Sequence, residues 1–334
     1  MATMADVARE AGVSVSTVSH IINGTRFVKE DTKERVLAAI RRTGYTHNTI
    51  ARSLVTASTK TIGLAISAIS NFYFADIVAA IDTAAREAGY TLLLADTHDD
   101  PEEELHVVQA LHQRRVDGVL YAPSTGADGP ALNYLAELGV PTVLVDRCAA
   151  DSLDQIGSEN RAATAALTGH LSALGHRRVG LIANLPDLRT TIERTEGYRD
   201  GLKEAGLSAD PALVVNGRPG TAFADAAVTE LLALPDPPTA LVIGNNHLAI
   251  ETMRALTKRG IRVPGDLALV TFDDFEWADL FHPRLTAMAQ PIGDIGGQAV
   301  RLLLDRLGDP HRPPRTVRLE PTFMHRDSCG CPAN

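Results

Sequence analysis

The sequence predicts an all-α head over residues 1–46, followed by an α/β body built from two doubly wound parallel sheets. Apolar residues recur at helical spacing in the head, whereas from residue 61 onward short apolar runs alternate with helical patterns. Such alternation is typical of parallel strands joined by helices. The chain is 45% hydrophobic and 22% charged, as in globular proteins, and no apolar run approaches the ~20 residues that span a bilayer.

The head begins with two predicted helices joined by a tight turn. Thr3 and Asp6 have the spacing of a capping box, and Gly12 is expected to end the first helix. Ser14 then caps a second helix, in which Val18, Ile21 and Ile22 face inward. The opposite face carries small or polar side chains, namely Val15, Ser16, Ser19 and His20. Such a face suits insertion into a DNA major groove, although the turn alone would fit an ordinary helical hairpin.

Charge distribution favours the DNA-reading interpretation. The whole chain has a formal net charge of -9. Residues 1–60 carry nine basic and five acidic side chains, a formal charge of +4, whereas the remainder carries 23 basic and 36 acidic side chains, a formal charge of −13. A basic head on an acidic body directs phosphate binding to one end of the chain.

A third helix and a linker are expected to complete the head. The third helix is predicted over residues 31–43 from the spacing of Val36, Leu37 and Ile40, with Gly44 at its end and Tyr45 packing back on the bundle. The segment before residue 56 is too short to be a stable helix without a packing partner, since helices below about 12 residues are marginal in water. The polar run 56–61 is typical of a linker.

The body is predicted to consist of two lobes. Strands are expected at 61–68, 91–95, 118–121 and 142–145, and in a second series at 179–183, 212–215, 240–243 and 267–271. Helical patterns lie between them, at 75–88, 102–113, 161–174, 191–205, 222–232 and 248–259. Right-handed crossovers make each series a doubly wound lobe that binds ligands beyond the carboxyl ends of its strands. A late helix at 293–307 is expected to finish the first lobe.

Motifs distributed along the chain form one recognisable set. They include Asp6-Val7-Ala8, Ala11-Gly12-Val13-Ser14, Thr17-Val18-Ser19, Asn23-Gly24, Gly44-Tyr45, Ala51-Arg52, Thr61-Ile62-Gly63, Gly175-His176-Arg177-Arg178, Gly197-Tyr198, Phe272-Asp273-Asp274 and Arg326-Asp327-Ser328. This set resembles the lactose-repressor/galactose-repressor (LacI/GalR) family of bacterial transcription regulators. The resemblance implies a DNA-binding head at 1–46, a hinge at 47–60, and an effector-binding and dimerisation domain at 61–334 of the type I periplasmic-binding-protein fold. Its N-lobe is expected at about 61–158 and 289–320, and its C-lobe at about 159–288.

The resemblance also implies which residues contact DNA. The second helix would enter the major groove of an operator half-site, and residues 48–55 would fold into a hinge helix when two subunits meet on DNA. Leu54 is either a wedge between base pairs in the minor groove, as the resemblance implies, or a residue that packs against the body. The expected contacts are Thr3, Met4, Ser14, Val15, Ser16, Thr17, Ser19, His20, Asn23, Lys29, Thr32, Asn48, Ala51, Arg52 and Leu54.

Two residues of the head depart from the family pattern. His20 stands where Arg is usual, and histidine has a shorter reach to a guanine edge and no bidentate fork. His20 therefore contacts a base, contacts a phosphate or makes no contact with DNA. His47 stands where Pro is usual, and the loss of a residue with a fixed φ is expected to loosen the hinge in the absence of DNA.

Polar residues at strand ends form the expected effector site. The carboxylates can accept hydrogen bonds from two ligand hydroxyls, and Arg194 can donate to ring or hydroxyl oxygens. Asn246 stands where the family commonly has Asp, which changes either ligand choice or only a helix cap. The aromatic run 72–74 either faces the ligand or plugs the start of a helix, and the resemblance favours Tyr73 and Phe74 as ligand contacts. The expected effector residues are Asn71, Tyr73, Phe74, Asp146, Arg147, Arg194, Asn245 and Asp273.

Signatures of enzymes and metal sites are missing from the sequence. There is no phosphate-cradling glycine loop, nucleophile elbow or His-Glu-x-x-His pair, so we expect neither catalysis nor a cofactor. The acidic pair Asp99-Asp100 is expected in a solvated turn. Cys329 and Cys331 are too few for a zinc site unless His325 and a partner chain help, so we expect no metal.

The sequence features are compatible to different degrees with three functions. A ligand-controlled repressor accounts for the head, the hinge and the body, whereas a small-molecule binding protein accounts only for the body and an α/β enzyme only for the sheets. One head reads one half-site, so we expect a homodimer on near-palindromic double-stranded operator DNA, and the six residues after Ser328 are too few for a tetramer-forming helix. The expected effector is a saccharide, with a nucleoside or another polar metabolite as the alternative.

The expected location is the cytoplasm. The first residues are predicted to form a capped helix and not a signal peptide, and three cysteines suit a reducing compartment. Both induction and corepression remain compatible with the sequence.

Overall fold

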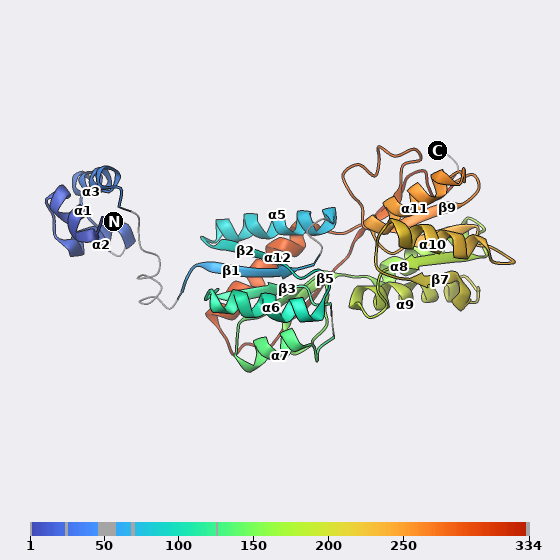
Figure 1. Cartoon of the computed structure of the whole chain (residues 1–334), viewed down its shortest axis with the longest axis horizontal. Helices are drawn as coiled ribbons and strands as arrows, with labels where there is room; N and C mark the ends of the chain where they lie inside the picture. The colour runs from blue at the N-terminus through green and yellow to red at the C-terminus, as the bar shows by residue number, and fades with distance from the viewer. Residues whose placement is uncertain (1, 24–25, 46–57, 68–70, 125, 332–334) are drawn as a thin grey trace. The chain divides into compact units, whose positions relative to one another are not determined.

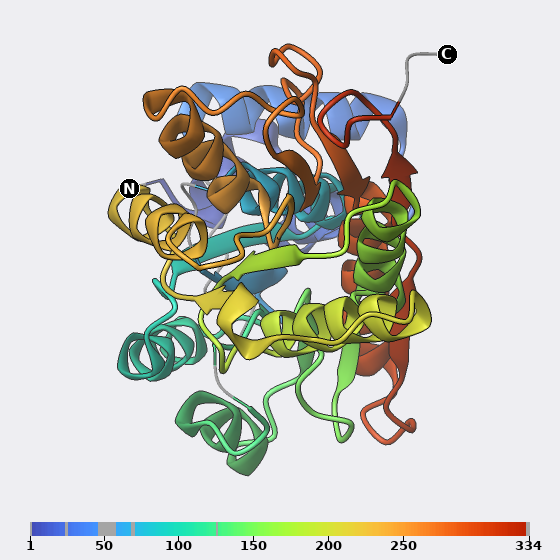
Figure 2. The same ribbon diagram turned by 90° about the vertical axis from the view of Figure 1, so that its right-hand side faces the viewer.

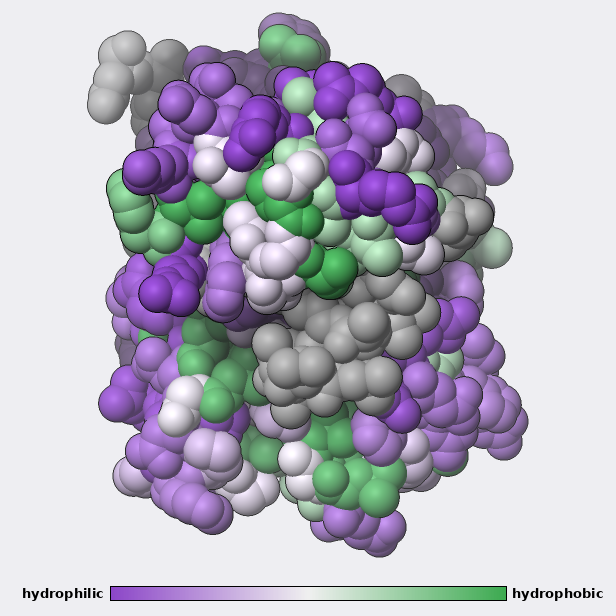
Figure 3. All heavy atoms as spheres, turned by 90° about the vertical axis from the view of Figure 1, so that its left-hand side faces the viewer, coloured by the Kyte–Doolittle hydropathy of each residue, from purple (hydrophilic) through white to green (hydrophobic). Residues whose placement is uncertain are grey.

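The computed structural model describes residues 2–23, 26–45, 58–67, 71–124 and 126–331. The chain divides into two compact units, Met1–Thr59 and Lys60–Asn334. The expected hinge contacts Asn48, Ala51, Arg52 and Leu54 lie outside the described residues, as does His47. Within the described ranges, the helices are all too short or too polar to cross a bilayer. On the face drawn in Figure 3, hydrophilic residues cover most of the surface and hydrophobic residues form scattered groups.

The head is a bundle of α1 (Met4–Ala11), α2 (Val15–Asn23) and α3 (Glu30–Thr43) around a small core. The predicted capping box is present, and Gly12 ends α1 in the left-handed region. The side chains fully buried in this core are Val7, Val18, Val36 and Ala39. Leu37 was expected in the core but is exposed, because Ala39 occupies the inward position of α3 instead.

The first lobe of the second unit is a six-stranded sheet in which every neighbouring pair is parallel (Figure 1). Its spatial order is β2 (Thr91–Asp96), β1 (Thr61–Ile66), β3 (Gly118–Tyr121), β4 (Thr142–Val145), β5 (Asp154–Ser158) and β11 (Thr316–Leu319). Helices α5 (Phe72–Glu87) and α12 (Ile292–Gly308) pack together on one face, and α6 (Pro101–Gln113) and α7 (Pro130–Glu137) pack on the other. As predicted, the late helix completes this lobe.

The second lobe is also built on a six-stranded sheet, and it faces the viewer in Figure 2. The spatial order of its sheet is β7 (Val214–Asn216), β6 (Val179–Ala183), β8 (Ala240–Ile243), β9 (Ala268–Phe272), β10 (Thr286–Ala289) and β12 (Thr322–Met324). The pairs are parallel except β10–β12, which is antiparallel. Helices α8 (Arg161–Ala173) and α9 (Arg189–Glu204) cover one face, and α10 (Thr221–Leu232) and α11 (Asn246–Lys258) cover the other.

The chain crosses between the lobes after β5, after β10 and after β11. The last crossing returns residues 322–331 to the second lobe, beyond the expected C-lobe boundary. The strand predicted at 212–215 is wrong at its start, since Pro211–Leu213 form a 3-10 turn ahead of β7. Strand β5 was not predicted because its sequence, Asp-Gln-Ile-Gly-Ser, has no apolar run although every residue in it is buried.

Candidate functional site

A cavity of about 510 Å³ lies beyond the carboxyl ends of strands from both sheets. This is where doubly wound sheets of this strand order bind ligands. The eight expected effector residues all line it: Asn71, Tyr73, Phe74, Asp146, Arg147, Arg194, Asn245 and Asp273. The sequence did not identify further lining residues, among them Asp96, His98, Asp99, Asn184, Thr190, Arg218 and His247. Most of these follow a strand end, which is the signal that identified the others.

Two aspartates occupy matching positions in the two lobes. Asp146 follows β4 and Asp273 follows β9, each is almost fully buried, and each has a φ of 68°. Few residues other than glycine adopt this left-handed conformation, although Asp tolerates it better than most. The conformation turns the chain sharply at the end of each strand, so that both carboxylates reach the cavity.

Close polar contacts through Tyr73 and Gln290 lie between the two aspartates. The Tyr73 hydroxyl donates to Asp146 Oδ1 at 2.6 Å, and its oxygen lies 3.1 Å from Gln290 Oε1. Gln290 Nε2 in turn donates to Asp273 Oδ1 at 2.5 Å. Burial and the neighbouring carboxylates raise the pKa of Tyr73, so the phenol remains a donor at neutral pH. Tyr73 and Gln290 therefore lie between the end of β4 in one lobe and the end of β9 in the other.

Arg147 is held on the first-lobe side of the cavity. Its Nη1 donates to Asp99 Oδ1 at 2.6 Å and to the carbonyl oxygen of Pro123 at 3.2 Å, and its Nη2 donates to Ser67 Oγ at 3.1 Å. Burial alone would raise the pKa of Asp99, but the Arg147 charge and hydrogen bond outweigh it and the pKa is lowered. The expectation of a solvated Asp99-Asp100 turn is therefore wrong for Asp99, while Asp100 caps α6.

Arg194 occupies the second-lobe side. Its Nη1 donates to the carbonyl oxygen of Gly244 at 2.6 Å, and its Nε donates to Asn160 Oδ1 at 2.8 Å. The guanidinium stacks 3.7 Å above the ring of Phe272, and its Nη2 lies 3.8 Å from Asp273 Oδ1. Burial nevertheless raises the pKa of Asp273, and Arg194 offsets this only in part.

Two helices begin at the wall of the cavity. Asn71 caps α5 by accepting from the Tyr73 amide at 3.1 Å, and Asn245 caps α11 by accepting from the Leu248 amide at 2.8 Å. Helix N-termini favour electronegative ligand atoms nearby. The structure thus gives Asn245 a capping role as well as a place in the cavity wall.

The aromatic run at 72–74 divides between two environments. Tyr73 and Phe74 line the cavity and also pack in the first-lobe core. Phe72 is instead half-exposed and meets Trp277 of the second lobe edge-on, with ring centroids 4.4 Å apart. A second contact between the lobes is made by Arg218, whose Nη1 donates to the carbonyl oxygen of His98 at 3.3 Å.

The described residues of the head that were expected to contact DNA are exposed or half-buried. Ser14 Oγ accepts from the Thr17 amide at 3.2 Å and so begins α2. Val18 is fully buried, while Val15 is 46% exposed and Ser16 is exposed beside it. The N-termini of α1 and α3 carry the other expected contacts, Thr3 with Met4 and Lys29 with Thr32. Ser19 and His20 are half-buried, and the side chain of Asn23 lies outside the described set.

Comparisons with known proteins agree with both parts of the chain. The model for bacterial regulatory proteins of the lacI family matches residues 3–48, and the model for a periplasmic binding protein-like domain matches residues 168–329. The chain is 33% identical over 330 residues to the HTH-type transcriptional repressor PurR of Aliivibrio salmonicida, covering 98% of this chain and 99% of the relative. The chain belongs to the LacI family.

Other relatives agree with this assignment. The ribose operon repressor of Haemophilus influenzae is 32% identical, with 98% of each chain covered. A transcriptional regulator CelR–cellobiose complex has a TM-score of 0.75 and 32% identity, covering 98% of this chain and 100% of that one. The lac repressor dimer bound to operator and the anti-inducer ONPF has a TM-score of 0.88 and 26% identity, covering 98% and 99%. This LacI-family chain is a ligand-responsive, DNA-binding transcription regulator and not an enzyme.

Proposed function

We propose that this LacI-family chain is a repressor that binds a near-palindromic operator under the control of a saccharide in the cavity between its lobes. The observation that supports a saccharide is the density of charged hydrogen-bonding groups around a space of about 510 Å³, within the usual range for small-molecule sites. Carboxylates accept from hydroxyl groups, and guanidiniums donate to hydroxyl and ring oxygens. Two relatives carry names that refer to cellobiose and to a ribose operon.

The aromatic residues of the cavity argue against a nucleoside. A base is best held between or against open ring faces, whereas Tyr73 and Phe74 meet edge to face, with centroids 5.2 Å apart and planes at 62°. Both rings are also part of the first-lobe core. The cavity therefore offers more directional polar groups than flat apolar surface, which suits a polyhydroxylated ligand.

A ligand screen on the full chain tests the effector class. Melting temperatures would be measured with pentoses, hexoses, disaccharides, purine bases and nucleosides, and each compound that raises the melting temperature would be added to a mobility-shift assay on promoter DNA. We expect a saccharide to stabilise the protein and to change the affinity for DNA. Stabilisation by nucleosides alone would contradict the proposal.

We propose that the N-terminal turns of α2 read the major groove, with base or phosphate contacts from Ser14, Val15, Ser16, Thr17, Ser19 and His20. Thr3, Met4, Lys29 and Thr32 at the N-termini of α1 and α3 would hold phosphates, because helix N-termini attract anions. From the resemblance, Asn48, Ala51, Arg52 and Leu54 would act in the minor groove, and Asn23 would act beside α2.

We also propose that the chain acts as a homodimer whose interface follows one face of both lobes. An apolar groove of about 910 Å³ begins at Phe72 in the first lobe and continues along Ile250, Met253, Trp277 and Phe281 in the second. Such a surface suits an isologous contact, which would place two heads on two half-sites. Sedimentation of the full chain measures this directly, and a monomer that nevertheless binds a two-half-site operator with undiminished affinity would contradict the dimer.

A further inference from the structure

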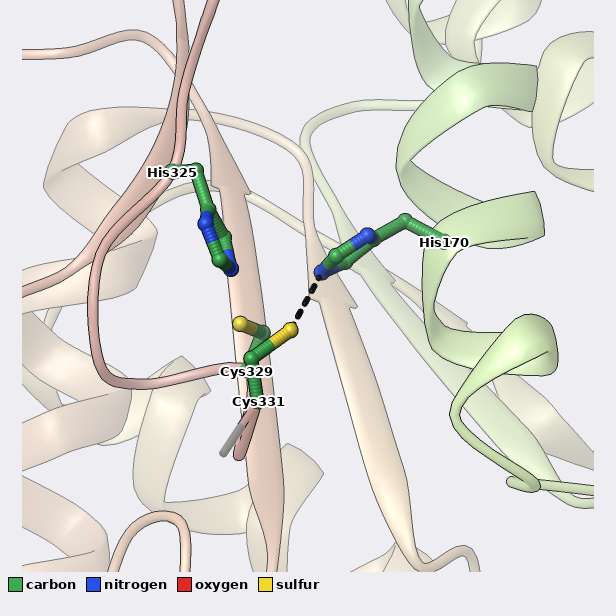
Figure 4. A group of neighbouring side chains, drawn as sticks. All are labelled: His170, His325, Cys329 and Cys331. Atoms are coloured by element: carbon green, nitrogen blue, oxygen red, sulfur yellow. Dashed lines mark hydrogen bonds between the residues drawn. The ribbon is translucent and has the colours of Figure 1, made fainter. Parts of the chain in front are cut away.

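Two histidines and two cysteines meet in the second lobe (Figure 4). His170 lies on α8, His325 follows β12, and Cys329 and Cys331 lie near the end of the described chain. One donor atom from each side chain lies within 4.8 Å of the other three. None of the four residues lines the effector cavity. The sequence expectation of no metal site left out His170, which is 161 residues away from Cys331.

The spacing of the donor atoms suits a tetrahedral zinc ion. With Zn–S bonds of about 2.3 Å and Zn–N bonds of about 2.0–2.1 Å, sulfur and nitrogen ligands at the tetrahedral angle lie about 3.5 Å apart. Cys331 Sγ lies 3.5 Å from His170 Nε2. All four donor atoms lie within 4.8 Å of one another, so the remaining separations exceed the tetrahedral spacing by no more than about 1.5 Å.

The packing around the cluster restrains its ligands. Cys329 is fully buried in the core beneath α8, and Cys331 packs against the same core. The ring of Phe323 meets His170 edge-on with centroids 5.0 Å apart, and it stacks on His325 with centroids 6.0 Å apart. Ligands held in place by packing lose little conformational entropy when they bind an ion.

The segment that carries the cysteines is also anchored just before them. Ser328 Oγ donates to the carbonyl oxygen of Leu269 at 2.7 Å and accepts from the Thr286 amide at 2.8 Å. These bonds join the turn to the starts of β9 and β10, so Cys329 and Cys331 leave the sheet at a fixed place opposite α8. An ion bound there would connect the last described segment to a helix from the beginning of the lobe.

We propose that His170, His325, Cys329 and Cys331 bind one zinc ion per chain and thereby fasten the C-terminal segment to α8. Two thiolates balance the charge of Zn²⁺, so the occupied site is neutral and tolerates partial burial, and the two thiol protons pass to solvent on binding. Two sulfur and two nitrogen donors select zinc over magnesium or calcium, which prefer oxygen. Because β12 pairs with β10 through only Met324, Phe323 and Thr322, the ion stabilises the edge of the second sheet.

Metal content and a cobalt spectrum of the untagged full chain test the proposal. The reduced protein would be stripped with a chelator, incubated with Zn²⁺, freed of unbound ion and analysed for zinc. We expect about one zinc per chain, and a melting temperature raised by about 4 °C or more under saturating Zn²⁺. Co²⁺ in place of zinc should give the strong visible bands of a tetrahedral ion and a near-ultraviolet thiolate-to-cobalt band.

Matched variants distinguish this site from incidental binding. Cys331→Ser and His325→Ala should each reduce the retained zinc at least tenfold and abolish the thiolate or tetrahedral cobalt signal. Cys148→Ser and His311→Ala remove a thiol in the first lobe and an exposed imidazole, and both should keep the full zinc content. His325 is exposed, so its variant should melt near the metal-free wild type and report on binding separately from folding.

Three results would overturn the proposal. The first is a zinc content below a tenth of an ion per reduced chain. The second is unchanged zinc in both Cys331→Ser and His325→Ala. The third is the finding of a Cys329–Cys331 disulfide in the isolated protein, together with a failure of the reduced protein to retain zinc or to give the cobalt spectrum.

Discussion

Asp273 is one of the second-lobe residues that line the effector cavity. It accepts from Gln290 and lies near Arg194, and both contacts are almost fully buried. A neutral amide of the same size can keep one contact but loses the charge-assisted acceptor that a ligand hydroxyl would use. Replacing Asp273 by asparagine should therefore remove a ligand contact through this carboxylate without a large change in the shape of the cavity.

We expect Asp273→Asn to weaken effector binding by at least tenfold while operator binding persists. A hydrogen bond to a charged group contributes about 1.5–3 kcal/mol, and about 1.4 kcal/mol corresponds to a tenfold change. Calorimetry with the effector and a mobility shift with operator DNA measure the two properties. Asp266→Asn, which removes an exposed carboxylate paired with Arg262, should leave both unchanged. Full effector affinity in Asp273→Asn would show that the ligand binds elsewhere.

The raised pKa of Asp273 predicts a pH dependence of stability. In the unfolded chain this carboxyl ionises near pH 4, whereas burial raises its pKa in the folded chain. Between these two pKa values the folded state binds more protons, so this group's contribution to the free energy of unfolding falls as the pH rises. The stability of Asp273→Asn relative to wild type should therefore increase with pH across this window. Urea denaturation at successive pH values above 4 measures it, and parallel curves would contradict the assignment.

Leu54 carries the prediction for the hinge, which rests on the family resemblance. If Leu54 is a minor-groove wedge, Leu54→Ser should lower operator affinity and abolish DNA bending. Unstacking a base step costs a few kcal/mol, and the small polar serine side chain makes too few apolar contacts with the bases to offset that cost. The melting temperature and effector affinity of the body should hardly change. Circular-permutation bending assays and thermal melts measure these effects. Full bending together with a lower melting temperature would favour packing against the body.

Residue type and strand-end position were sufficient to predict much of the cavity wall. Asp146 and Arg147 directly follow a predicted strand, Asp273 lies two residues after another, and all three carry charges that are costly to bury. Asp99 was missed because its partner, Arg147, lies 48 residues further along the chain. For the same reason the sequence did not show that His170 lies close to Cys329 and Cys331. Spacing along a sequence does not indicate which helix packs against a distant turn.

At the scale of elements, the pair α8–α9 depends on two glycines of α9, Gly197 and Gly201, for its close approach. A Cβ at Gly197 of α9 would overlap the backbone carbonyl of Arg161 at the start of α8. Backbone atoms of two packed helices cannot yield as a flexible side-chain tip can. Gly169 of α8 lies near no atom that an added Cβ would meet within 4 Å, which makes it a matched control.

We expect Gly197→Ala to destabilise the second lobe by about 1–3 kcal/mol, because the helices must separate to admit the methyl group. Gly169→Ala should be neutral or stabilise the lobe by about 0.5–1 kcal/mol, because alanine loses less backbone entropy in a helix. Chemical denaturation of the two variants beside wild type measures the difference. Equal stability of the two variants would show that the helices adjust without cost.

The elements that were predicted correctly share a strong local pattern. Strands β1, β3, β4, β6 and β8 are apolar runs buried on both faces, and the predicted helices have a clear apolar side. Strand β12 was missed because its residues are mostly exposed and it is held by pairing with β10 from outside its own segment. Local patterns therefore predict strands that are apolar runs, but neither β12, which is held by its neighbour, nor β5, which is buried but polar.

At the scale of the whole molecule, the division of charge matches the division into compact units. Eight of the nine basic residues within 1–60 lie in the first unit and Lys60 begins the second, while residues 61–334 carry 23 basic and 36 acidic side chains. An acidic body resists nonspecific contact with the duplex, so sequence reading depends on the head. The body, in turn, holds the cavity and all of its lining residues.

We therefore expect residues 61–334, prepared alone, to bind the effector as the full chain does but to lose operator binding by at least about 10³-fold, the usual margin between specific and nonspecific binding. The affinity of the full chain should also fall steeply as salt rises, because phosphate contacts release counterions. Calorimetry on the fragment measures effector binding, and mobility shifts at several salt concentrations measure DNA binding. Equal operator affinity of the fragment and the full chain would place DNA recognition in the body. It would contradict a role for the head and its positive charge in operator binding.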